Sequence, residues 1–320
     1  MLPRLFVGPM SKEIVDIAID YSNKKKTLGL IPSRRQVEYD GGYVNDWKTA
    51  DFTSYVRKNS NNILLVRDHG GPSQGSLNDD GLKSLKTDID SGFDILHIDP
   101  WKTCKTIEDG IKKTANLIQH SIMKNPNLTF EVGTEESIFP YSPADLDKLL
   151  IGLQTKLGDK FNLIKFVVIQ SGVEIAGTEN IGNYNPDRLE KMVTVAKKYS
   201  LYSKEHNGDY LSFDQIQHRA NLGLDSINIA PEFGVTQTRA LLERNMVKFQ
   251  DALKTCVKIG KFNKWIPNNL KINPPEHLIV EVSGHYCFMD QPFKNVSHLI
   301  KDELSAILFE RFDEICGAWK

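Results

Sequence analysis

Short apolar runs with strand character alternate with segments of helical period along the first 230 residues of the chain. The segments between the runs place apolar residues three or four positions apart, the spacing that buries one face of a helix. Ser11 and Ser142 precede two of these segments as predicted helix caps. The eight apolar runs are 5–8, 28–32, 63–66, 95–98, 128–132, 164–169, 201–203 and 226–230.

Strands that are apolar on both faces and alternate with helices are typical of a parallel sheet. Eight such units predict an α/β fold in which the sheet closes into a (β/α)8 TIM barrel. The competing prediction is a doubly wound open sheet, but no GxGxxG follows the first run. The pattern becomes mainly helical near the end, so we expect one domain: a barrel over 1–240 and a helical extension over 241–320 that packs on it.

Composition narrows the class of protein. The chain has 320 residues, of which 40% are hydrophobic and 25% are charged, as in a soluble globular enzyme. A formal net charge of -1 gives no overall basic field for nucleic acid or an anionic membrane. Apolar runs of about 18 residues and a signal-peptide pattern are missing, so we expect a cytoplasmic protein, and four scattered cysteines without CxxC pairs predict reduced thiols.

Polar residues follow the predicted strands at the ends that would meet at one mouth of the barrel. Such groups are costly near a core without partners, which indicates a ligand or an ion. Two histidines among carboxylates suit a divalent cation: imidazole nitrogens favour zinc, whereas magnesium or manganese would prefer the oxygens. The residues concerned are Arg34, Gln36, Asp68, His69, Asp99, Glu131, Gln170, His206, Asn207 and Asn228.

The histidines are not equivalent. His69 and His206 follow different strands at corresponding ends, which favours both as ligands. His97 precedes Ile98 within its strand, so the simpler expectation is a hydrogen-bonded residue. His285 follows the strand-like "LIVEVS" and could reach the mouth as a lid residue. Lys102, Lys204 and Arg34 could each meet an anionic group, although charged loop residues are often only solvated.

Six ordered motifs resemble the class II ketose-bisphosphate aldolases. Within that superfamily the similarity is greatest to the branch named after the so-called non-catalytic subunit of D-tagatose-1,6-bisphosphate aldolase, whose "GGY" segment is matched at 41–43. The resemblance covers roughly residues 5 to 245. The motifs are "RDHGGP" (67–72), "FDILHIDPW" (93–101), "EVGTEE" (131–136), "VVIQSGVE" (167–174), "EHNGDY" (205–210) and "GLDSINIAPEF" (223–233).

The resemblance implies roles for individual residues. It makes Asp68 the group that handles a hydroxyl proton, His69 and His206 zinc ligands, and Glu131 a second catalytic carboxylate. Gln170 stands where aldolases place a third zinc histidine, so the metal binds more weakly, another group such as Glu131 completes the site, or no metal binds. The residues expected to contact substrate are Arg34, Gln36, Asp99, Asn207, Asn228 and His285.

The resulting hypothesis is a metal-dependent enzyme that acts on a ketose or ketose phosphate by retro-aldol and aldol chemistry at C3–C4. A C4 epimerase is the leading form, and an aldolase is the close variant, because retention of both fragments is all that separates them. The alternative is a non-catalytic subunit that stabilises a separate aldolase, for which Gln170 is the best support. A small-molecule sugar is the expected ligand; a homo-oligomer or an aldolase partner subunit is the expected assembly.

Overall fold

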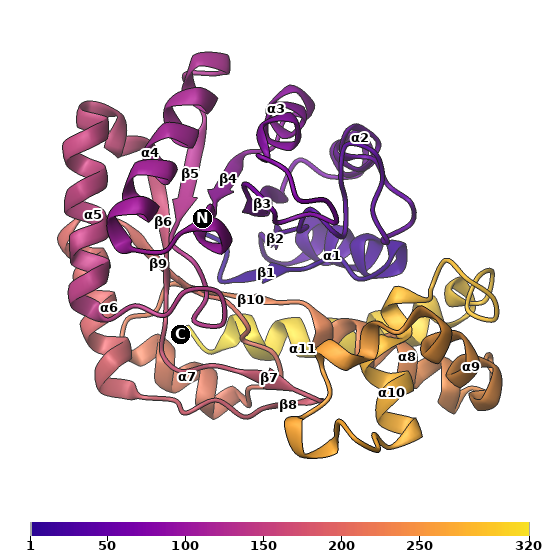
Figure 1. The fold of residues 1–320 in the computed structure, drawn as a ribbon. Coiled ribbons are helices and arrows are strands. Elements are labelled where there is room, and N and C mark those ends of the chain that lie inside the picture. The colour runs from indigo at the N-terminus through magenta and orange to yellow at the C-terminus, as the bar shows by residue number, and fades with distance from the viewer. Residues whose placement is uncertain (1, 320) are drawn as a thin grey trace.

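Eight parallel strands close into a barrel in the computed structural model, which describes residues 2–319 (Figure 1). Around the ring the order is β1-β10-β9-β6-β5-β4-β3-β2, so the predicted TIM barrel is confirmed. A two-stranded antiparallel hairpin, β7 (Ile175–Ala176) and β8 (Glu179–Asn180), lies outside the ring. The barrel strands are β1 (Leu5–Val7), β2 (Gly29–Leu30), β3 (Leu64–Gly70), β4 (Ile95–Ile98), β5 (Thr129–Val132), β6 (Ile164–Ile169), β9 (Tyr202–Glu205) and β10 (Ser226–Ile229).

Helices connect successive strands and cover the outside of the barrel (Figure 1). The side chain of Ser11 accepts a hydrogen bond from the backbone N–H of Ile14, and Ser142 forms a reciprocal capping box with Asp145, so both predicted caps are present. The eight helices of the barrel are α1 (Lys12–Lys24), α2 (Thr49–Asn59), α3 (Leu82–Ser91), α4 (Ile107–Lys124), α5 (Pro143–Leu157), α6 (Pro186–Lys198), α7 (Phe213–Asn221) and α8 (Pro231–Glu243).

Three further helices form the tail: α9 (Phe249–Ile259), α10 (Glu276–Ser283) and α11 (Lys301–Gly317). α10 packs against both α8 and α9, and α11 runs back along α1 and α8 (Figure 1). Tyr21 of α1 packs edge-on against two rings of α11, Phe309 and Phe312. The strand-like "LIVEVS" is wrong as a strand: it lies in α10, where Ile279, Val280 and Val282 are buried.

The interior of the barrel is filled in layers. A cluster of Phe6, Ile31, Val66, Ile95 and Phe166 occupies the layer nearer the amino ends of the strands. Side chains two residues further along a strand share the same face. The next layer is therefore polar, and the residues that follow Val66, Ile95, Thr129 and Tyr202 at that spacing are Asp68, His97, Glu131 and Lys204.

Strand β3 is longer than its apolar run predicted, because it continues to Gly70 and includes the residues expected to follow it. Its register against β4 shifts between Arg67 and Gly70, and His69 has φ 47. A left-handed residue inside a strand is a feature of bulges, which re-aim side chains. Regular alternation would turn His69 away from Asp68; the bulge is the reason that both contribute to one site.

None of the helices within 2–319 is both long and apolar enough to cross a membrane. The four cysteines are free, and Cys256 and Cys287 bring their sulfur atoms to 3.6 Å inside the tail.

Candidate active site

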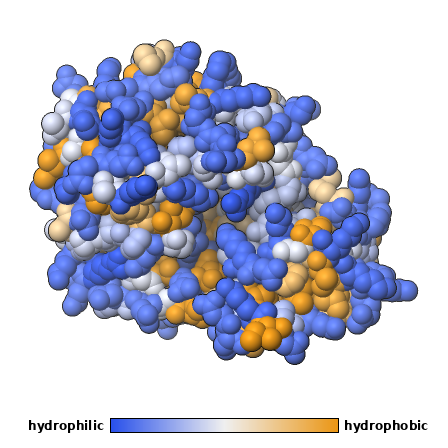
Figure 2. Space-filling view, in the orientation of Figure 1, coloured by the Kyte–Doolittle hydropathy of each residue, from blue (hydrophilic) through white to orange (hydrophobic). Residues whose placement is uncertain are grey.

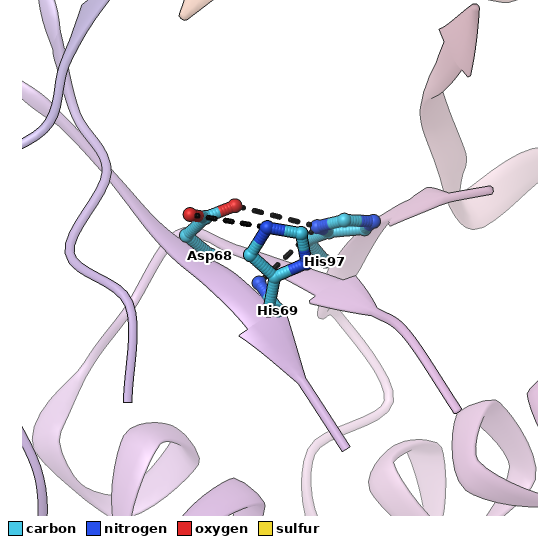
Figure 3. Close-up of side chains that lie close together, drawn as sticks. All are labelled: Asp68, His69 and His97. Atoms are coloured by element: carbon cyan, nitrogen blue, oxygen red, sulfur yellow. Dashed lines mark hydrogen bonds and ion pairs between the residues drawn. The ribbon is translucent and has the colours of Figure 1, made fainter. Parts of the chain in front are cut away.

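The polar layer of the barrel gathers three histidines around Asp68. The ring centroids of His69, His97 and His206 lie 5.1 to 5.6 Å from one another. Figure 3 shows the carboxylate of Asp68 directed at His69 and His97, which come from adjacent strands. Two groups, one of Asp68, His69 and His97 and one of His97, Glu131 and His206, bring a ligand atom of each member within 4.8 Å of the others.

His69 is oriented by a carboxylate behind it. Its Nδ1 lies 2.5 Å from Oδ2 of Asp99, which is fully buried and also accepts hydrogen bonds from Thr134 and the backbone of Trp101. The carboxylate takes the Nδ1 proton as acceptor, so the second nitrogen, Nε2, faces the mouth 3.6 Å from Oδ2 of Asp68. A carboxylate behind a histidine is the usual support of a metal-binding imidazole.

His206 has the same arrangement with the nitrogens exchanged. Its Nε2 lies 2.9 Å from Oε1 of buried Glu131, and its Nδ1 lies 3.8 Å from Oδ1 of Asp68. Two carboxylate-supported histidines therefore direct their remaining nitrogens at one carboxylate.

This arrangement fits a cation. Oδ1 of Asp68 is buried and has no hydrogen-bond partner among the residues described. Two ligands that are each about 2.1 Å from a tetrahedral zinc ion lie roughly 3.4 Å apart, close to the spacings around Asp68. Asp68, His69, His97, Glu131 and His206 are the residues that could hold a metal, in two groups that share His97.

His97 belongs to the cluster but has both nitrogens engaged. Its Nε2 lies 3.0 Å from the carbonyl oxygen of Gly133, which only accepts, and its Nδ1 accepts from the backbone N–H of His69 at 3.2 Å. His97 therefore fixes the backbone of the β3 bulge. These contacts agree with the expectation that His97 is a hydrogen-bonded strand residue.

The charges of the cluster are strongly coupled. Burial opposes charge on Asp68, but His69 and the other two histidines outweigh it and hold the pKa of this carboxyl well below its usual range. Burial also lowers the pKa of His69, yet Asp68 and Asp99 outweigh it and raise that pKa to about 10. A proton on His69 balances the carboxylates without a cation, and a metal ion would take its place.

Gln170 does not face this cluster as a free ligand. Its Oε1 accepts from the backbone N–H of Tyr141 and from Arg188, and its Nε2 donates to the carbonyl oxygens of Thr134 and Phe139. These four hydrogen bonds use the whole amide. Gln170 thus fixes the loop after β5, and its role as a metal ligand stays a prediction from the sequence.

Arg34 and Gln36, which the sequence predicts to contact substrate, have protein partners in the structure. Arg34 is 2% exposed and donates to Glu38, Asp79 and the carbonyl of Gly71, and Gln36 bonds Ser33 and the carbonyl of Pro9. Both side chains hold the loop after β2 in place. A polar residue after a strand cannot be assigned to the ligand or to the loop until its partners are known.

The other predicted substrate residues lie in different settings. Asn207 pairs with Glu135 at the edge of a cleft of about 620 Å³ that Lys264 and Trp265 of the tail also line. Asn228 faces the barrel interior beside Phe6, and its Oδ1 has no partner in the described chain. His285 is 1% exposed and packs on Tyr286 with ring centroids 4.1 Å apart, so it is a buried residue of the tail and not an open lid.

Figure 2 shows one face of the barrel and the tail: it is mostly hydrophilic, with apolar side chains scattered over the barrel and over the tail. Ile272 and Val257 are exposed apolar residues of that tail.

The sequence named Lys204 only as a residue that could meet an anionic group and did not predict its carboxylate partner Glu131. Lys204 is fully buried, and its Nζ lies 2.5 Å from Oε2 of Glu131. The signal was the period of two: Lys204 precedes His206 by two residues, and His97 pairs in register with Glu131.

No protein-family model matches the chain, and no curated protein matches its sequence. Solved structures do match. A probable tagatose 6 phosphate kinase from Sinorhizobium meliloti 1021 superposes with a TM-score of 0.73 at 16% identity, covering 99% of this chain and 92% of that chain. The YdjI aldolase from Escherichia coli K12 gives a TM-score of 0.62 at 12% identity, covering 98% and 91%.

The fructuronate-tagaturonate epimerase UxaE from Cohnella laeviribosi gives a TM-score of 0.67 at 10% identity, covering 99% of this chain and 81% of that chain. The fold is thus a TIM barrel like those of an aldolase and of a fructuronate-tagaturonate epimerase. This agrees with the class II aldolase-like superfamily that the motifs resemble, and at these identities the likeness establishes the fold.

Proposed function

We propose that the protein is a metal-dependent enzyme that breaks and remakes the C3–C4 bond of a ketose or ketose phosphate, with C4 epimerisation as the outcome and net aldol cleavage as the close variant. The observation that carries the proposal is the convergence of His69 Nε2 and His206 Nδ1 on Asp68, at 3.6 and 3.8 Å. Aldolases and an epimerase among the structural neighbours support the same chemistry.

His69 and His206 would hold the cation, and two nitrogen donors favour zinc over magnesium or manganese. When bound, the cation would polarise the C2 carbonyl and stabilise negative charge on the C1–C3 fragment. Asp99 and Glu131 orient the two imidazoles from behind. Glu131 thereby takes a supporting task in place of the direct catalytic one expected from sequence.

Asp68 is the proposed base. Its side chain is 18% exposed, against 3% for His206, so it can reach a substrate in the mouth. The Asp68 carboxylate takes the proton of the C4 hydroxyl and the C3–C4 bond breaks: its electron pair forms the C2–C3 double bond of an enediolate, the C2 oxygen takes the negative charge, and C4 becomes an aldehyde. If the aldehyde turns over before the bond forms again, C4 is inverted and the proton returns from Asp68.

The rim of the mouth favours an anionic sugar. Arg35, Lys102 and Lys264 come from the loop after β2, from the 3-10 turn η1 (Trp101–Thr103) and from η3 (Lys261–Lys264). Burial, then Arg35 and Lys264, lower the pKa of the Lys102 ammonium, against the opposing charges of Asp99 and Glu135. These three positively charged side chains suit a substrate with an anionic group. The ketol end of such a substrate would meet the metal ion, and a phosphate or carboxylate at its other end would meet the three side chains.

The non-catalytic subunit is the second candidate, and Gln170 was its support. Because the proposed ligands come from β3 and the segment after β9, the amide of Gln170, which follows β6, does not weaken the enzyme proposal. A scaffold would not need two histidines supported by buried carboxylates.

The test supplies zinc-loaded and chelated protein with fructose 6-phosphate, tagatose 6-phosphate, fructuronate and tagaturonate in D₂O, and follows the C4 epimer by NMR. Retro-aldol epimerisation predicts zinc-dependent conversion without deuterium at C4, because C4 keeps its hydrogen as an aldehyde. Loss of turnover in Asp68→Asn is expected. Failure of the zinc-loaded protein to convert any ketose would contradict the proposal.

A further inference from the structure

Lys204 is a fully buried cation that no substrate can reach. It lies on β9 in register with Ser226, and its Nζ sits 3.6 Å from the centre of the Phe6 ring and 4.4 Å from that of Phe166. A charge in such surroundings costs several kcal/mol unless it is paired. Its ion-pair partner is Glu131, at 2.5 Å from Nζ to Oε2.

The same carboxylate is shared with His206. Oε2 of Glu131 accepts from Lys204, and Oε1 lies 2.9 Å from Nε2 of His206. One oxygen is therefore fixed by the lysine and the other is presented to the imidazole. With its proton on Nε2, His206 offers the lone pair of Nδ1 to the mouth.

We propose that Lys204 is a positioning residue: by clamping Glu131 it fixes the tautomer of His206 that leaves Nδ1 open to a cation. The proposal rests on the proposed function, in which His206 is a ligand. Lys204 lies behind Glu131, away from the mouth. It therefore cannot act as an amine that reacts with substrate. The ion pair is also more than filling, because a buried charge pair is seldom better for stability than apolar side chains of the same volume.

If Lys204 positions Glu131, the single and double variants should differ in zinc affinity in a way that a packing role of Lys204 would not produce. Lys204→Met leaves the Glu131 carboxylate buried without its partner, so it no longer holds one geometry, and zinc affinity should fall about 10- to 100-fold, the usual effect of losing support behind a ligand. Lys204→Met combined with Glu131→Gln removes both charges and keeps an amide oxygen for His206. The double variant should bind zinc within about threefold of the wild type.

The experiment measures zinc affinity by competition calorimetry in the full chain for wild type, Lys204→Met, Glu131→Gln and the double variant. Lys165→Met, an exposed lysine on β6, is the matched control and should bind zinc like wild type. Nitrogen-15 NMR of the His206 ring in metal-free protein reports the tautomer directly. Unchanged affinity and tautomer in Lys204→Met, or a double variant as weak as the single one, would overturn the proposal.

The proposed function and the role of Lys204 can be refuted separately. If wild type binds no zinc, the proposed function fails, while the tautomer of metal-free His206 still tests Lys204. If Lys204→Met does not fold, Glu131→Gln is compared with the double variant. The inference then requires the double variant to fold and to keep Nδ1 of His206 unprotonated. A protonated Nδ1 in the double variant would refute it.

Discussion

Oδ1 of Asp68 lies 3.8 Å from Nδ1 of His206, and no described residue gives that oxygen a hydrogen bond. A buried acceptor without a donor is costly, and the cost is compensated when a cation occupies the space beside it. The relationship depends on residues 138 positions apart in sequence, which only a closed ring of strands brings together.

Asp99→Asn should weaken zinc binding about 10- to 100-fold without unfolding the barrel, because a neutral amide supports the Nδ1 proton of His69 less well than the carboxylate does. Calorimetric titration with zinc measures the change. Asp147→Asn on the surface helix α5 is the control and should leave affinity unaltered. Equal affinity in Asp99→Asn and wild type would show that Asp99 does not support the site.

Gln170→Ala should lower the free energy of unfolding by about 1–3 kcal/mol or more, because backbone groups of the loop after β5 lose buried partners. Zinc affinity should change by less than threefold. Urea unfolding and zinc titration give the two numbers. A large loss of zinc affinity in a variant of normal stability would restore Gln170 as a ligand.

Adjacent arginines should behave in opposite ways. Arg34→Met breaks buried pairs with Glu38 and Asp79 and should cost about 3–5 kcal/mol of unfolding free energy. Arg35→Met should alter stability by less than about 0.5 kcal/mol and raise KM for an anionic ketose roughly tenfold, as expected for a lost charged contact. Denaturant unfolding and steady-state kinetics on both variants check this. Identical effects of the two substitutions would refute the division of roles.

His285 should make the fold sensitive to acid. Burial, then Lys264, lower its pKa from 6.5 to about 3 in the folded chain. The folded state therefore disfavours the charged ring, so its contribution is fully present above pH 6.5 and is lost as the pH falls from 6.5 toward 3, with about 2 kcal/mol gone at pH 5.

His285→Phe keeps an aromatic ring against Tyr286 and removes the titration. Between pH 8 and 5 the free energy of unfolding of wild type should fall by about 2 kcal/mol more than that of the variant. Parallel slopes of stability against pH would contradict this assignment, and exposed His298→Gln should follow wild type.

The sequence predicted the barrel well, since strands buried on both faces and regular helix stripes depend on local pattern alone. It also selected Asp68, His69 and His206, because strand ends converge in such a fold. It did not separate residues that hold a loop from residues that face a ligand: Arg34 and Gln170 are polar in sequence for either reason, and only their partners 37 and 36 positions away, Gly71 and Thr134, decide. The β3 bulge depends on a contact with His97, which no local pattern encodes.

The central claim is that one divalent ion is shared by His69 and His206, and metal content per chain tests it most directly. After zinc loading and dialysis, wild type should retain one zinc ion, whereas His69→Ala and His206→Ala should each retain essentially none and His218→Ala on helix α7 should match wild type. Equal zinc content in all four proteins, or loss from only one of the two site variants, would contradict the shared site and the carbon–carbon chemistry built on it.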